Sequence, residues 1–211
     1  MSGFTHLLDA PQWLALAAAL GWASGFRLYA AVFLVGLAGF MGWLPLPPGL
    51  QVLQHPAMLA ASGFMLLVEF FADKIPLVDS LWDTVHTLIR IPAGAALAAG
   101  AIGATGADSA VVSSVAALLG GSLAAASHAT KMTTRAAVNT SPEPFSNVAV
   151  SLAEDGLVVG ALWLAANHPL LFGVALAITL VLMVCLMVLL LRFLKAALRS
   201  VSRVLRGRSA A

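Results

Sequence analysis

Long apolar runs separated by short polar links dominate this chain and restrict its possible folds more than any other feature. Charged residues make up only 9% of the 211 residues, whereas hydrophobic residues make up 61%. A soluble domain has about 25% charged residues, because its surface must be hydrated. So little charge cannot cover a soluble surface, and we therefore expect lipid to be the solvent for most of the chain.

Six segments are long and apolar enough to be candidate spans, since a helix needs about 20 apolar residues to cross the hydrocarbon. Lipid requires backbone groups to be satisfied internally, which favours helices. The strict alternation of a transmembrane barrel strand is missing from the last run. The expected spans are 11–40, 56–71, 91–105, 109–130, 147–166 and 169–191. The sequence therefore predicts an all-α membrane protein with six transmembrane helices.

The basic residues predict the orientation of these spans. Six spans leave both termini on one side, and the C-terminal tail, 192–211, holds six basic residues. The positive-inside rule makes that side cytoplasmic, in a bacterial inner membrane. The other bases are Lys74, Arg90, Lys131 and Arg135, in links expected on the same side, and Arg27, within the first span. The first ten residues have no basic n-region, so we expect them to be retained.

The first span has an unusual centre. Thirty residues would extend about 45 Å as a straight helix, more than the hydrocarbon thickness of about 30 Å. Gly21, Gly25 and Arg27 lie in its middle and predict a break, a strong tilt or a re-entrant segment. The fourth span has a similar pattern, with adjacent glycines at 120 and 121 followed by polar and basic residues.

The two halves of the chain therefore resemble each other. Each has a Gly-rich first span, a second span bearing acids and a plainer third span. Residues 1–105 form the first expected repeat and 106–191 the second, and three spans per repeat force opposite orientations. Inverted repeats with broken helices are typical of secondary transporters, whose sites lie at the repeat interface.

Acids within spans are the main candidate site residues, because an ionisable group at the helix centre costs roughly 2.5–3.5 kcal/mol to insert. An ion or proton site is one interpretation of these acids, and structural ion pairs with Arg27 or Lys131 are the other. Arg27 itself could pair with Glu69, Glu154 or Asp155, or it could anchor a substrate anion. Asp73 and Lys74 could also lie simply at the membrane interface. The candidate substrate- or ion-binding residues are Arg27, Glu69, Asp73, Lys74, Lys131, Arg135, Asn147, Glu154 and Asp155.

Asp79, Asp83 and His86 share one helical stripe in the link before the third span. Oxygen and imidazole ligands at this spacing could hold a divalent cation. A solvated acidic helix face on the membrane surface is the alternative.

The segment 139–147 is a helix break followed by a restart. Pro142 and Pro144 prevent helix continuation, and Ser146 or Asn147 can cap the next helix. The free N–H groups of a capped start suit an anion, although an ordinary inter-helix turn has the same pattern.

Lipid is the main expected partner. The tail bases follow three- and four-residue steps, which predicts a surface helix on anionic headgroups. No aromatic residues interleave with them, so nucleic acid is not expected. The small residues between 93 and 103 permit close helix packing within or between protomers, so the sequence is compatible with a homo-oligomer.

Three strings are similar to those of a bacterial membrane family: GFRLYAAVFLVGLAG, EFFADKIPLVDSLWDTVHTLIRIPAGA and NTSPEPFSNVAVSLAEDG. They resemble the family known as domain of unknown function 4126, over roughly residues 10–190. That resemblance implies a multi-pass membrane protein and brings no activity with it. Glu69, Asp73 and Lys74 are also faintly similar to a motif of inverted-repeat cation/proton exchangers, and Glu154–Gly156 match it less well.

We therefore expect a transporter- or channel-like protein that moves a small ion or solute, coupled to a cation or a proton. A non-transporting membrane scaffold or lipid-binding protein is the alternative from another class. An intramembrane enzyme acting on lipid headgroups is a third, and it is disfavoured because no nucleophile–base triad or phosphate loop is present. No cofactor is expected.

Overall fold

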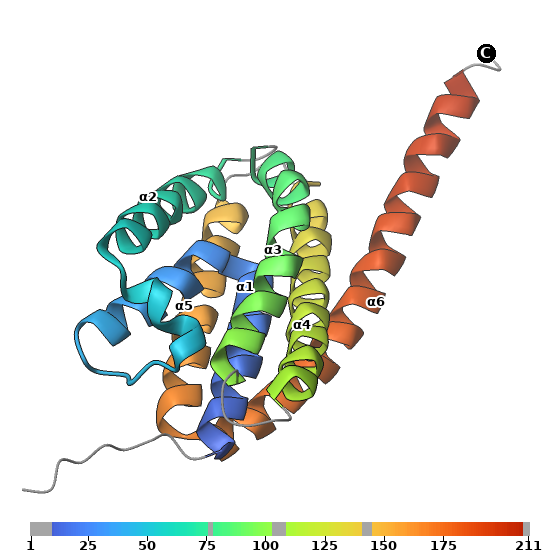
Figure 1. Ribbon diagram of the computed structural model, residues 1–211. Coiled ribbons are helices and arrows are strands. Elements are labelled where there is room, and N and C mark those ends of the chain that lie inside the picture. The colour runs from blue at the N-terminus through green and yellow to red at the C-terminus, as the bar shows by residue number, and fades with distance from the viewer. Residues whose placement is uncertain (1–9, 76–77, 103–108, 141–144, 209–211) are drawn as a thin grey trace, which may run out of the picture.

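The computed structural model describes residues 10–75, 78–102, 109–140 and 145–208, and these residues are helical apart from short links (Figure 1). Six α-helices and one short 3-10 helix follow one another along this part of the chain. They are α1 (Ala10–Phe40), η1 (Pro48–Gln54), α2 (Pro56–Ala72), α3 (Val78–Ile102), α4 (Ser109–Val138), α5 (Phe145–Asn167) and α6 (Pro169–Arg208).

Five of these helices are long and apolar enough to cross a membrane, namely α1, α3, α4, α5 and α6. The pair formed by η1 and α2 is bent by 70° and is the candidate for a sixth, broken span. These helices are those of a multi-pass membrane protein. The described residues thus offer five candidate spans, or six if the bent pair counts as one span.

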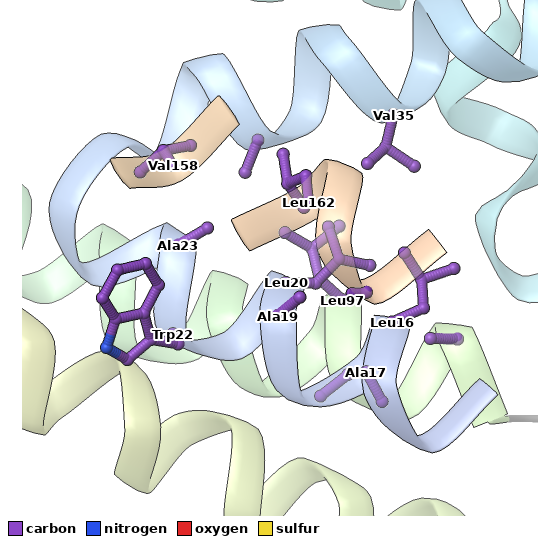
Figure 2. Packing of buried hydrophobic residues seen from close by; sticks show 14 of the residues in the cluster. Leu16, Ala17, Ala19, Leu20, Trp22, Ala23, Val35, Leu97, Val158 and Leu162 are labelled. Carbon is purple, nitrogen blue, oxygen red and sulfur yellow. The ribbon is translucent and has the colours of Figure 1, made fainter. Parts of the chain in front are cut away.

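α1 is the central helix of the bundle. It packs against every other described helix. In its most apolar stretch 56% of the residues are buried inside the molecule, compared with 6% for α6. Figure 2 shows Leu16 and Leu20 of α1 beside Leu97 of α3 and Leu162 of α5. Burying these side chains against one another holds α1 between the two halves of the chain.

Small residues bring α1, α3 and α4 unusually close together. A Cβ atom added to Gly21 of α1 would lie 2.7 Å from Cα of Gly120 in α4. One added to Gly120 would lie 2.2 Å from Cβ of Ala98 in α3, and one added to Gly94 would lie 2.6 Å from Cβ of Ala124. Close backbone approach through small residues is a typical way to pack membrane helices. The small residues of α3 thus serve packing within the protomer.

α1 bends at Arg27, as the sequence predicted for the first span. Arg27 has non-helical backbone angles, φ −145° and ψ 76°, within an otherwise helical segment. The similar break expected in the fourth span is not found, because α4 runs as one helix from Ser109 to Val138.

The expected bounds of two spans were wrong. The third helix begins at Val78, so Asp79, Asp83 and Arg90 lie inside α3 and not in a link on the membrane surface. These polar residues face inward, while Leu81 and Leu88 are 68% and 83% exposed. Hydropathy alone underestimates the length of such a helix. The polar residues of its inner face lower the mean hydropathy, although its outer face is mostly apolar.

α4 extends past the expected end at residue 130, so Lys131 and Arg135 are helical residues of the interior. The last helix runs on to Arg208 without a break between span and tail, and it leaves the bundle as it does so (Figure 1). The proposed repeat boundary at 105/106 lies outside the described residues.

Candidate functional site

A cluster of buried charges lies where α1, α3, α4 and α5 meet the end of α2. We call it the charge cluster, and its members come from both halves of the chain. It consists of Arg27, Glu69, Asp73, Asp79, Asp83, Arg90, Lys131, Arg135, Glu154 and Asp155. Every Asp and Glu in the described part of the chain belongs to it.

The bend of α1 supplies backbone acceptors to this cluster. The carbonyl of Phe26 accepts a hydrogen bond from Nζ of Lys131 at 3.1 Å. The carbonyl of Gly25, on the same side of the bend, accepts from Nη1 of Arg90 at 3.4 Å. Side chains of α3 and α4 therefore supply partners to these two carbonyl groups next to the bend.

Arg27 joins the two halves of the molecule. Its guanidinium lies 2.5 Å from Asp73 and 3.0 Å from Asp155. Its Nη2 also donates to the hydroxyl of Ser151 at 2.7 Å and approaches Glu154 at 3.8 Å. Arg27 is fully buried and meets acids of both halves, but its partner from the first half is Asp73, because the expected partner Glu69 pairs with Arg90.

Lys131 lies among carboxylates from three elements. Its Nζ is 2.7 Å from Asp73, 3.3 Å from Asp83 and 3.7 Å from Glu154. The side chain has no exposed surface. A buried ammonium needs such partners, since its three N–H groups would otherwise lose their hydration without replacement.

Arg135 and Arg90 hold the two ends of the charge cluster. Arg135 donates to Glu154 at 2.8 Å and also to the side-chain oxygen of Asn147. Arg90 donates to Glu69 at 2.6 Å and to Asp83 at 2.7 Å. Each guanidinium thus bridges two elements, which suits the planar fork of donors that arginine presents.

The charge cluster contains more acids than bases. Six carboxylates face four cationic side chains, and all but Asp155 are almost completely buried. Three of the buried carboxylates also have one oxygen without a hydrogen-bond partner among the described residues: Glu69, Asp73 and Asp83. A buried, unpaired acceptor costs free energy, so additional protons or cations would be stabilised at these oxygens.

Asp73 lies at the C-terminal end of α2, outside the long helices. Burial alone would raise the pKa of its carboxyl, but Lys131 and Arg27 outweigh burial and hold the pKa below its usual value. Lys74 follows at the edge of the charge cluster, where it donates to the Phe70 carbonyl at 3.0 Å. Burial lowers the pKa of Lys74.

Asp79, Asp83 and His86 do not form the expected metal site. Asp79 accepts hydrogen bonds from Asn139, Asp83 pairs with Arg90, and Nε2 of His86 bonds to the hydroxyl of Tyr29 at 3.1 Å. Among the described residues, no group of three or more His, Cys, Asp or Glu side chains is arranged to hold a metal ion. The three side chains do lie on one face of α3, but each contacts a different basic or polar neighbour, and they do not converge on one point.

The restart before α5 lies only partly within the described residues, since 141–144 fall outside them. Asn147 is buried one turn into α5 and bonds to Arg135. It therefore belongs to the charge cluster's surroundings, and no anion is needed to explain it.

Sequence reasoning missed Arg90, Ser151 and His128 as candidate site residues, the last with its Nδ1 3.2 Å from Nη1 of Arg90. Arg90 lies four residues after His86 and thus continues the stripe of Asp79, Asp83 and His86 along α3. Extending that stripe by one turn would have revealed an inward polar face. Ser151 and His128 gave no comparable signal, because single polar residues on small-residue helices are common.

Comparisons with known proteins identify the chain only at the level of a family. Neither the curated proteins nor the solved structures contain a significant match. The family model described as "Domain of unknown function (DUF4126)" matches residues 14–189, which is most of the chain. The chain therefore belongs to the DUF4126 family, whose description assigns no function.

Proposed function

We propose that this protein is a secondary transporter or channel-like protein that moves a small ion or solute, with a cation or proton at the charge cluster. The excess of buried carboxylates at the bend of α1 is the observation that supports this most directly. Ionisable groups are expensive within a membrane and commonly mark ion or proton pathways. In a cluster that only stabilised the fold, equal numbers of acids and bases would be more favourable, because a buried charge without a counter-charge costs free energy.

The bent helix supports the same proposal. In many transporters a discontinuous helix lies at the binding site, where its unwound carbonyls and half-helix ends face the transported ion. Here the bend at Arg27 places the carbonyls of Gly25 and Phe26 against basic side chains. The bend is thus located where the charges of both halves converge.

An inverted repeat is part of the proposal. Residues 1–105 and 106–191 would be the two units, with α1 matched to α4 and α2 matched to α5. Arg27 and Lys131 would then be counterparts on the first helix of each unit, as would Asp73 and Glu154 on or after the second. Both cations contact both of these acids, which is consistent with a site at a repeat interface.

The basic helix α6 is proposed to bind anionic lipid on the cytoplasmic side of the inner membrane. Arg192, Lys195 and Arg199 are exposed on it. Each Lys or Arg near an anionic surface contributes about 1 kcal/mol. Co-sedimentation with phosphatidylglycerol vesicles, compared with phosphatidylcholine vesicles of equal size, tests this separately from transport.

A Glu154→Gln variant in proteoliposomes tests transport. The purified protein is reconstituted with a pH-sensitive dye inside, and flux is followed after a pH jump or a salt gradient is imposed. Wild type is expected to show flux, and the variant is expected to lose it while remaining folded by size-exclusion chromatography. Lys195→Gln, on the exposed face of α6, is the control and is expected to retain flux.

A non-transporting scaffold is the second candidate. It is favoured by the pairing of all four buried cations, each of which has a carboxylate within 2.8 Å. In that case Glu154→Gln would lower the melting temperature, and wild type would show no flux to any ion tested. Turnover of a lipid headgroup without a gradient would instead indicate an enzyme.

A further inference from the structure

The ammonium group of Lys131 occupies a site built from oxygen atoms. Four oxygens surround it: the Phe26 carbonyl at 3.1 Å, Asp73 Oδ2 at 2.7 Å, Asp83 Oδ1 at 3.3 Å and Glu154 Oε2 at 3.7 Å. We call these atoms the Lys131 cage. They come from α1, the end of α2, α3 and α5, while Lys131 itself comes from α4.

We infer that the Lys131 cage is a binding site for a monovalent cation of about the size of ammonium or potassium, and that Lys131 is its built-in competitor. This inference rests on the proposed function, because it names the class of ion that the charge cluster would take. The lysine ammonium marks the position that the free cation occupies when the side chain withdraws.

The carboxylates of the cage do not depend on Lys131 for their only partner. Asp73 is paired with Arg27, Asp83 with Arg90 and Glu154 with Arg135, at 2.5, 2.7 and 2.8 Å. Each arginine contacts the same carboxylate oxygen that Lys131 contacts. The oxygens are thus held in place by contacts that remain when the ammonium leaves.

Unpaired oxygens next to the cage also point to a cation. Asp73 Oδ1 and Asp83 Oδ2, the second oxygens of two cage carboxylates, are buried and have no hydrogen-bond partner among the described residues, and the same is true of Nε of Arg90 and Arg135. The charge cluster already has six carboxylates for four cationic groups, Lys131 included. When the ammonium leaves, the excess of negative charge grows, which favours replacement by another positive charge.

The distances select the class of cation. Oxygens bind Mg²⁺ at about 2.0–2.1 Å and Ca²⁺ at about 2.3–2.6 Å, whereas the cage oxygens lie 2.7–3.7 Å from Nζ. That spread suits a large cation held loosely. A monovalent cation that enters as the Lys131 ammonium withdraws also leaves the net charge of the cluster unchanged.

The test uses purified full-length protein and a Lys131→Met variant, which keeps most of the aliphatic stem and removes the ammonium. Melting temperatures are measured in potassium, ammonium, sodium and choline chloride at equal ionic strength. We expect potassium or ammonium to raise the melting temperature of Lys131→Met by about 5 °C relative to choline. Wild type should respond by less than about 1 °C, because its own ammonium fills the cage.

Two control variants complete the test. Lys195→Met removes an exposed lysine of α6 that lies outside the charge cluster, and it should behave as wild type. The double variant Lys131→Met/Asp73→Asn removes a cage carboxylate together with the lysine, and it should lose the response. Equal melting temperatures of Lys131→Met in potassium and choline would overturn the inference, as would failure of this variant to fold in every salt.

The outcome is separable from that of the transport assay. Flux in wild type without any cation-specific stabilisation of Lys131→Met would leave the proposed function standing and remove the cage. Stabilisation of Lys131→Met without flux in wild type would keep the cage as a cation site and remove the transporter.

Discussion

Arg27 forms a 2.5 Å ion pair with Asp73, and the same guanidinium lies 3.0 Å from Asp155. One side chain at the bend of the central helix thus joins acids from both halves of the chain. Because no water replaces a lost partner easily at a fully buried site, the stability of the bundle depends on this cation.

The Arg27→Met variant is expected to be strongly destabilised. Removing one partner of a buried pair leaves an uncompensated charge and typically costs about 3–5 kcal/mol. At about 2–4 °C per kcal/mol, the melting temperature in detergent should fall by about 6–20 °C. Arg192→Met, at an exposed position of α6, should shift it by less than about 2 °C, and similar shifts in both variants would contradict this account.

Glycine substitutions should separate packed from open helix faces. Gly120→Ala places a Cβ atom 2.2 Å from Cβ of Ala98, whereas a Cβ atom on Gly156 of α5 meets nothing within 4 Å. Overpacking typically costs about 1–3 kcal/mol, while an open helical Gly→Ala change gains about 0.5–1 kcal/mol. Thermal scans of the two variants should therefore move in opposite directions, and a neutral Gly120→Ala would show that α3 and α4 can separate without cost.

Acid should destabilise the protein partly through Asp73. Its pKa lies below the usual value of 3.8 in the folded state because of Lys131 and Arg27. A carboxyl with a depressed folded pKa contributes stability above its unfolded pKa and loses that contribution as the pH falls through the folded pKa. Below about pH 4, wild type should lose melting temperature more steeply than Asp73→Asn, and parallel curves would show that Asp73 titrates normally.

The orientation can be tested with single cysteines in a Cys185→Ser background. Gln51 of η1 and Lys195 of α6 are both exposed and lie at opposite ends of the predicted topology. An impermeant maleimide added to intact cells should label Gln51→Cys, and it should label Lys195→Cys only after the inner membrane is opened. Labelling of both from the same side would exclude the six-span arrangement.

The sequence alone was sufficient for the helical membrane class, and it limited the centre of α1 to a break, a tilt or a re-entrant segment. It also indicated that Arg27 pairs with buried acids, although it named Glu69 where the structure has Asp73. Each of these predictions follows from a local feature of the sequence. Long apolar runs indicate spans, glycines within a span weaken the helix, and a charge within a span needs a partner of opposite charge. The start of α3 could not be found from hydropathy. Asp79, Asp83 and Arg90 lower the mean hydropathy of a helix whose outer face, with Leu81 and Leu88, is mostly apolar.

The positive-inside argument was weaker than the basic residues suggested. Arg90, Lys131 and Arg135 were assigned to cytoplasmic links, but they are buried in the charge cluster and are at most 1% exposed. The positive-inside rule applies to basic residues in loops, so buried cations that pair with acids carry no information about orientation. The orientation therefore depends on Lys74 and on the exposed bases of α6, such as Arg192 and Lys195.

The placement of Arg27 also constrains how the chain is made. During synthesis Arg27 leaves the ribosome well before its partner Asp155, by roughly ten seconds at ordinary elongation rates. Until α5 is made, Asp73 is the only one of the three acids paired with Arg27 that has been synthesised, whereas Arg90 and Lys131, which donate to the carbonyls at the bend, already precede Asp155 in the chain. The first helix thus enters the bilayer before its final geometry can be stabilised, and its maturation has to wait for the fifth.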